Sequence, residues 1–122
     1  MRIVIPVLDK SGMNSRISEH FGRAPYFLTI DLDESDNITR HDIVVNDSEH
    51  FGGVGLPPDR ILQLQPNALI TGGMGPKALN IFQNARVAVF RANTTNVIDT
   101  VAAYTNNELR ELTEGCKDAH HH

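Results

Sequence analysis

The chain has 122 residues, which fits a single domain of ordinary size. Apolar residues make up 40% and charged residues 21%, a balance typical of a globular protein that buries its own core. The 11 Lys and Arg against 15 Asp and Glu give a net charge of −4, which argues against a protein that coats nucleic acid. The single cysteine, Cys116, excludes a disulfide framework within one chain.

The hydropathy pattern argues against a membrane protein. No apolar run approaches the ~18 residues that a membrane-spanning helix needs. The N-terminal residues lack the pattern of a secretory signal and are typical of a strand. We therefore expect a cytoplasmic protein with neither a membrane nor a nucleic acid as partner.

The first half of the chain predicts three strands and two long loops. An apolar, β-branched run at residues 3–7 indicates a central strand covered on both faces. The connection 9–24 has no periodicity, which is typical of a functional loop. Two further strands at 26–32 and 38–45, joined by turn residues, are close enough for an antiparallel hairpin. A polar, glycine-rich loop follows the hairpin.

The second half alternates helices with short buried strands. Leu56-Pro57-Pro58-Asp59 predicts a helix start, because proline is tolerated in the first turn, and Pro66 predicts its end. Strands are expected around 68–70 and 87–90, with a helix beginning at Pro76 between them. Asn96 predicts the N-cap of a third helix, with Asp99 three residues on. Residues 108–112 predict a short final helix.

The expected order is β-β-β-α-β-α-β-α, which favours a three-layer α/β sandwich. Its single mixed sheet would have five strands, one of them antiparallel. We expect one domain over 1–114 and a flexible Cys/His tail over 115–122. Since ligands of such sheets bind where strand ends meet helix N-termini, we expect the loops 9–24, 46–56 and 71–76 to gather there.

The turn Thr71-Gly72-Gly73-Met74-Gly75-Pro76-Lys77 is the first candidate for chemistry. A glycine-rich turn between strand and helix exposes backbone N–H groups at the positive helix end, which suits an anion. The spacing of a phosphate-binding P-loop is absent. Tight packing of the backbone against the helix is the alternative interpretation.

Two further loops carry histidines. His50-Phe51-Gly52-Gly53-Val54-Gly55 is a second glycine-rich approach to a helix, and a solvated surface loop is its alternative interpretation. In Ser18-Glu19-His20-Phe21-Gly22-Arg23, the imidazole of His20 could ligate a metal or donate to an anion. Arg23 could neutralise the anion with its forked donors. Phe21 is more typical of a core anchor.

The C-terminal segment contains Cys116, His120, His121 and His122. Thiolate and imidazole are the ligands that iron, copper and zinc select. From composition alone, the three terminal histidines are equally consistent with native ligands and with the remnant of a purification tag.

Met1-Arg2-Ile3-Val4-Ile5-Pro6-Val7, followed by Ile17-Ser18-Glu19-His20-Phe21-Gly22-Arg23-Ala24-Pro25-Tyr26-Phe27, resembles the dinitrogenase iron–molybdenum cofactor biosynthesis family. NifX, NafY and the C-terminal domain of NifB belong to that group. The resemblance extends over His50 with its glycines and over 72–77 and 96–104, up to about Leu112. The His-Phe-Gly-Arg-Ala string is its most specific part.

The resemblance implies an RNase H-like fold and the binding or carriage of an anionic metal–sulfur cluster, either iron–sulfur or iron/molybdenum–sulfur. It implies no turnover of an organic substrate. The residues expected to contact the cluster are His20, Phe21, Gly22, Arg23, His50, Gly52, Gly53, Gly72, Gly73 and Gly75. The expected metal ligands are His20, Cys116, His120 and His121, because small members of the family often end in Cys- or His-containing tails.

We therefore expect a monomeric, non-enzymatic cluster carrier or chaperone whose partners are cluster-assembly or cluster-accepting proteins. A regulatory module that binds a nucleotide or small anion through 72–77 is the alternative. An RNase H-like nuclease is a less favoured alternative, since Asp9 and Asp31 are its only strand-associated candidates and no clear acidic triad follows.

Overall fold

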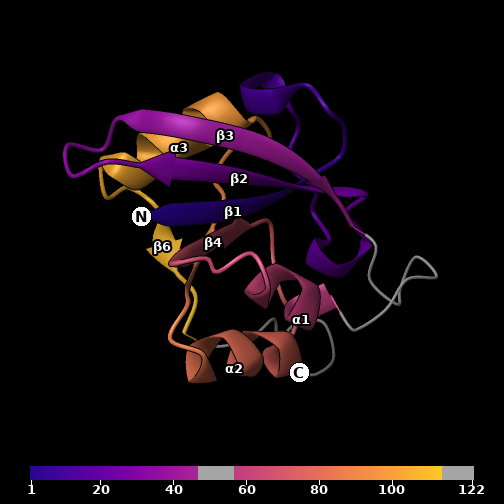
Figure 1. The fold of residues 1–122 in the computed structure, drawn as a ribbon. Coiled ribbons are helices and arrows are strands. Elements are labelled where there is room, and N and C mark those ends of the chain that lie inside the picture. The colour runs from indigo at the N-terminus through magenta and orange to yellow at the C-terminus, as the bar shows by residue number, and fades with distance from the viewer. Residues whose placement is uncertain (47–56, 114–122) are drawn as a thin grey trace.

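The computed structural model describes residues 1–46 and 57–113 as an α/β fold (Figure 1). Its strands are β1 Arg2–Val7, β2 Tyr26–Leu32, β3 Ile38–Val45, β4 Ala68–Thr71, β5 Ala88–Arg91 and β6 Arg110–Glu111. Its helices are α1 Pro57–Leu62, α2 Pro76–Asn84 and α3 Val97–Thr105, with short 3-10 turns η1 Gly12–Asn14 and η2 Phe21–Arg23.

The strands form one mixed sheet of six strands in the order β3-β2-β1-β4-β5-β6. At its centre, β1, β4 and β5 are parallel. The strand β2 is antiparallel to both β1 and β3, and β6 is antiparallel to β5. Parallel strands require crossovers, and α2 supplies one between β4 and β5.

Two hydrophobic cores, one on each face of the sheet, define three layers. One core packs Ile61 of α1 and Phe82 of α2 against alternate residues of the central strands, such as Val4 and Leu69. The other core packs α3 against the opposite residues of the same strands. Because successive strand residues point to opposite faces, the unbroken apolar runs of the central strands supply both cores. The expected three-layer sandwich is thus confirmed.

The expectation of five strands with one antiparallel strand is wrong. Residues 108–112 do not form a helix, since Arg110 and Glu111 form β6 instead. Asn107, in the left-handed region at φ 60°, follows the C-cap of α3 and turns the chain back toward the sheet. The Leu112 N–H then donates to the Val89 carbonyl at 2.7 Å. Pairing with the open edge of β5 satisfies backbone groups that a short isolated helix would leave to water.

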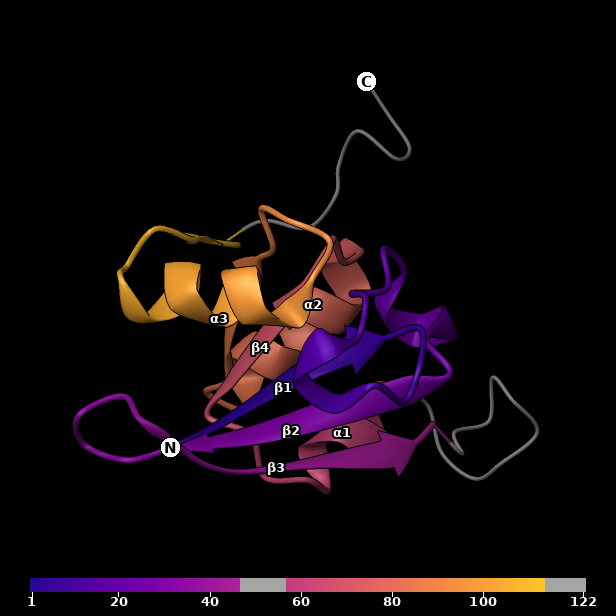
Figure 2. The same ribbon diagram turned by 90° about the horizontal axis from the view of Figure 1, so that it is seen from above.

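The two ends of the sheet are occupied by different kinds of connection. Figure 2 shows the N-terminus and the turn between β2 and β3 at one end, and the loop carrying η1 and η2 at the other. The second of these ends holds the carboxyl end of β1 and, since β4 and β5 are parallel to β1, their carboxyl ends too. We call it the carboxyl end of the sheet and the first the amino end.

Candidate functional site

A hollow of about 710 Å³ lies at the carboxyl end of the sheet. We call it the main hollow. It is formed by the loop after β1, the loop between β4 and α2, and the last residue of β5. Its lining residues are Glu19, His20, Phe21, Gly22, Arg23, Gly72, Gly73, Met74, Gly75 and Arg91. Of the three loops predicted to gather, 9–24 and 71–76 do so, because β1 and β4 are parallel neighbours, and residues 47–56 of the third lie outside the described residues.

The His20 segment is held in place by a local hydrogen-bond turn and by an aromatic anchor. The buried Ser18 hydroxyl accepts a hydrogen bond from the His20 N–H at 3.2 Å and lies 3.0 Å from the His20 carbonyl, to which it donates. Phe21 is buried and its ring packs edge-on against Phe82 of α2, with centroids 5.6 Å apart. The His20 imidazole itself stays exposed. The backbone of His20 is therefore fixed while its side chain is left available.

Gly72 brings the two loops into direct contact. A Cβ at this position would lie 3.0 Å from the Glu19 Cα and 3.2 Å from the Glu19 carbonyl oxygen. Such contacts with backbone atoms leave no room for any other residue without a shift of one loop. The glycine at 72 is thus a requirement of the close approach between the β1 and β4 loops.

Gly75 is the N-cap of α2 and has open space around it. No heavy atom lies within 4 Å of a Cβ built there. The first N–H groups of an α-helix lack helical partners, and Pro76 at the first helical position has none to offer. The start of α2 therefore presents a positive dipole end to the main hollow.

The charged residues of the main hollow are of both signs. Arg23 and Arg91 are exposed guanidinium groups, and Glu19 is an exposed carboxylate. With the α2 N-terminus and the His20 imidazole, the two arginines give the hollow the means to bind an anion.

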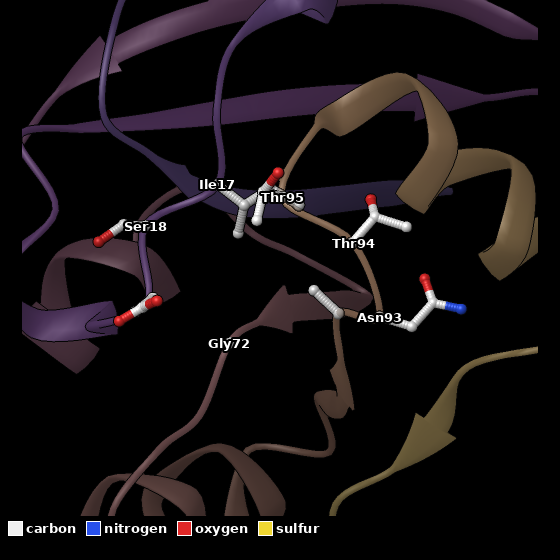
Figure 3. A pocket seen from close by; sticks show the side chains of 8 residues that line it. Ile17, Ser18, Gly72, Asn93, Thr94 and Thr95 are labelled. Atoms are coloured by element: carbon white, nitrogen blue, oxygen red, sulfur yellow. The ribbon is translucent and has the colours of Figure 1, made fainter.

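A smaller hollow of about 240 Å³ adjoins the main one, and we call it the side hollow. Figure 3 shows Ser18 on one side of it, Asn93 and Thr94 on the other, Ile17 next to Thr95 above, and Gly72 below. The Ile17 N–H donates to the Thr95 carbonyl at 2.8 Å, which closes one end. Glu19 and Gly72 line both hollows.

The structure brings one set of predicted residues together. His20, Phe21, Gly22 and Arg23 share the main hollow with Gly72, Gly73 and Gly75. Phe21 contributes mainly as a core anchor, as its apolar character predicted. His50, Gly52, Gly53, Cys116, His120 and His121, with the tail 115–122, lie outside the described residues.

Three residues of the main hollow were not among the predicted contacts: Glu19, Met74 and Arg91. Met74 is buried between the hollow and the core of α1 and α2. Arg91 ends β5 and lies beside Gly72 and Gly73 through the pairing of β5 with β4. The sequence could have predicted the position of Arg91, because a charged residue directly after a buried strand is expected at the carboxyl end of the sheet.

The two carboxylates considered for a nuclease lie at opposite ends of β1. Asp31 pairs with Arg2 at the amino end, 2.9 Å from its Nε, and this hydrogen bond lowers the Asp31 pKa. Asp9 follows the carboxyl end of β1, where hydrogen bonds from Ser11 and Arg16 lower its pKa. The strand between them separates them by roughly 20 Å. They cannot share metal ions that stand about 4 Å apart in two-metal sites.

Within residues 1–46 and 57–113, no three side chains of His, Cys, Asp or Glu form a group that could hold a metal ion. No helix in these same ranges is long and apolar enough to cross a membrane. The metal-ligand set expected from His20 with the tail therefore stays a prediction.

The structure is an α/β fold with an open hollow, lined by two arginines and a histidine, at the carboxyl end of its sheet. The chain belongs to the dinitrogenase iron–molybdenum cofactor family, whose sequence model matches residues 1–107. Membership points to a role in the biosynthesis or carriage of that cofactor.

Relatives support both the family and the fold. MJ0580 of Methanocaldococcus jannaschii is 28% identical over 114 residues, which are 92% of each chain. TM1290 of Thermotoga, which carries a provisional NifB assignment, is 28% identical with a TM-score of 0.72, covering 94% of this chain and 96% of its own. The apo form of the orange protein of Desulfovibrio gigas has a TM-score of 0.75 at 21% identity, covering 95% and 96%, and shows the fold alone.

Proposed function

We propose that this protein binds an anionic metal–sulfur cluster, iron–sulfur or iron/molybdenum–sulfur, in the main hollow and carries it to an acceptor. The cluster is cargo, and the protein is a carrier or chaperone with no catalytic role. Cluster-assembly and cluster-accepting proteins are its proposed partners, and a cytoplasmic monomer is the proposed form.

One observation carries the proposal. His20 and Arg23 from the β1 loop meet the glycine turn before α2 and Arg91 from β5 around one open hollow. An exchangeable imidazole, two guanidinium groups and a helix N-terminus together suit a soft, negatively charged cluster. The family to which the chain belongs supports the choice of a metal–sulfur cargo over other anions.

The small number of metal ligands in the main hollow is also consistent with a protein that carries a cluster and releases it. A structural metal site is closed by four protein ligands and contributes to folding. Here the described residues supply His20 beside exposed cations, so a cluster held there would keep open coordination positions for an acceptor. We propose that Cys116, His120 and His121 supply further exchangeable ligands.

Anaerobic reconstitution with iron and sulfide, with and without molybdate, tests this function. It is run on the full-length chain and on a chain that lacks His120–His122, so that metal bound through the terminal histidines is separated from metal bound through His20 and Cys116. We expect uptake of iron and sulfide with visible absorption, and loss of most of both in the His20→Ala, Cys116→Ala double variant. His41, exposed on the edge strand β3, is the matched histidine, and His41→Ala should bind like wild type. Equal uptake by wild type and the double variant would eliminate the proposed ligands.

Thermal unfolding with ligands separates the alternatives. A nucleotide- or phosphate-binding module would be stabilised by ATP or phosphate through mass action. We expect stabilisation by a metal–sulfur anion and none by ATP. The RNase H-like relationship stays a prediction. For the nuclease, the separation of Asp9 and Asp31 removes its candidate pair.

A further inference from the structure

A carboxylate in an anion-binding hollow works against binding, and Glu19 occupies that position. It lines both the main hollow and the side hollow, among Arg23, Arg91 and the glycine turn. The salt bridges of residues 1–46 and 57–113 join Arg2 to Asp31 and Arg40 to Asp42, so neither of them neutralises Glu19. Glu19 therefore adds one negative charge to the residues that line the main hollow.

The backbone geometry prevents Glu19 from moving away with its loop. The Gly72 contact fixes the Glu19 Cα and carbonyl against the β4 loop. On one side, the Ile17 N–H is bonded to Thr95, and on the other, the Ser18 hydroxyl locks the turn at His20. The backbone of Glu19 is therefore fixed where the two hollows adjoin, and its carboxylate stays within reach of both.

We propose that Glu19 is a release residue: its negative charge weakens the hold of the main hollow on an anionic cargo and speeds the transfer of that cargo. This inference rests on the proposed function. Two arginines, a helix N-terminus and an imidazole would retain a multiply charged anion, whereas a carrier must give it up. One opposing charge lowers the affinity without removing any group that contacts the cargo.

Glu19→Gln isolates this effect, because glutamine keeps the size of the side chain and removes its charge. The probe is tetrathiomolybdate, a coloured metal–sulfur dianion, with the full-length protein as host, so that all variants share the same tail. We expect Glu19→Gln to bind it roughly three- to tenfold more tightly, from one Coulomb interaction at the edge of a solvated site. The gain should appear as slower dissociation.

Three variants serve as controls. Glu19→Asp keeps the charge and should bind like wild type. Glu34→Gln removes a carboxylate from the exposed turn between β2 and β3 at the amino end of the sheet, and should leave the affinity unchanged. Arg91→Gln should weaken binding several-fold, the opposite sign to Glu19→Gln. Since salt screens charge interactions, the Glu19→Gln effect should shrink toward unity at about 1 M salt, whereas a change of packing would persist.

The outcomes separate the inference from the function on which it rests. If wild type binds tetrathiomolybdate and Glu19→Gln binds it equally or less tightly, Glu19 is not a release residue, although the carrier function stands. A weaker Glu19→Gln would instead make the carboxylate a contact of the cargo. If wild type fails to bind metal–sulfur species at all, the proposed function falls and the inference with it.

Discussion

The amino and carboxyl ends of the sheet differ in how they use their charged side chains. At the amino end, the charged side chains form hydrogen bonds within the fold. The Arg2 guanidinium donates to Asp31 and, at 2.8 Å, to the Leu64 carbonyl, and the Arg2 N–H donates to Asn67 at 2.7 Å. These bonds tie β1 to β2 and to the connection between α1 and β4.

At the carboxyl end, local hydrogen bonds of the loop after β1 are joined by a close backbone contact and by apolar packing. Gly72 allows the loop after β4 to contact the backbone of the loop after β1. Phe21 packs against Phe82 and so holds its own turn in place. His20, Arg23 and Arg91 stay exposed around the main hollow. The comparison teaches that backbone contacts, local hydrogen bonds and a buried ring can hold loops whose charged side chains remain exposed.

The largest expected effect comes from removing Phe21, the ring that anchors the loop after β1 at the carboxyl end of the sheet. Phe21→Ala should lower the free energy of unfolding by about 3 kcal/mol, because it deletes a buried ring and leaves a cavity. It should also weaken tetrathiomolybdate binding, since the His20 turn loses its anchor. Denaturant titration and probe binding measure the two effects.

Phe90→Ala is the matched control for that loss. Phe90 packs edge-on against Tyr104, with centroids 5.2 Å apart, and lines a separate hollow with Met1 and Asp36. It should lower stability and spare probe binding once the protein is folded. Equal loss of binding in both variants would contradict the division between the two ends.

The second largest expected effect is a loss of stability when the contact between Gly72 and the Glu19 backbone is disturbed. Gly72→Ala should cost about 2 kcal/mol, since its methyl group would press on the Glu19 backbone. Gly75→Ala, three residues on, adds the same methyl group in open space and should cost under about 1 kcal/mol, through loss of a favourable N-cap residue. Denaturant unfolding of both variants measures the difference, and similar costs would show that the loops do not depend on this contact.

The smallest effect is electrostatic and belongs to the amino end. The Arg2 hydrogen bond lowers the Asp31 pKa. The pair therefore stabilises the fold fully above the unfolded-state pKa of about 4. This stabilisation is lost as the pH falls through the lower, folded-state pKa. Because 37% of the Arg2 side chain is exposed, solvent screening limits the contribution to about 1 kcal/mol or less.

Asp31→Asn should therefore lower stability at pH 7 and approach wild type below the folded-state pKa. Asp42→Asn removes the carboxylate of a more exposed pair with Arg40 and should change stability less. Unfolding measured across pH tests both variants. A difference between Asp31→Asn and wild type that does not depend on pH would show that the loss is one of packing rather than charge.

Most of the architecture could be predicted because local signals and tertiary structure agree. The strands at 26–32 and 38–45 have the bounds that their sequence predicted. The N-cap at Asn96 forms as expected, with its side chain accepting from the Asp99 N–H at 2.9 Å. The segment 108–112 could not be predicted, because its helix-favouring residues give way to an open strand edge that only the assembled sheet provides.

The candidate site could be predicted in part for the same reason. His20 and Gly72 follow recognisable strands, so their meeting at one end of the sheet followed from strand order. The 3.0 Å approach of Gly72 to Glu19 could not be predicted, since glycine in a short turn is compatible with many causes. The position of the Glu19 charge in the lining of both hollows could not be predicted either, because it depends on how the folded loops pack against each other.

The short strand β6 has a consequence for how the folded protein meets other copies of itself. By pairing with β5, it covers an edge whose free N–H and C=O groups would template intermolecular sheet growth. Among the described strands, β3 then forms the other border of the sheet. That border carries Arg40 and Asp42 and an irregular register near Leu32, features that discourage edge-to-edge aggregation. The sheet is thereby protected on both borders while its carboxyl end stays open.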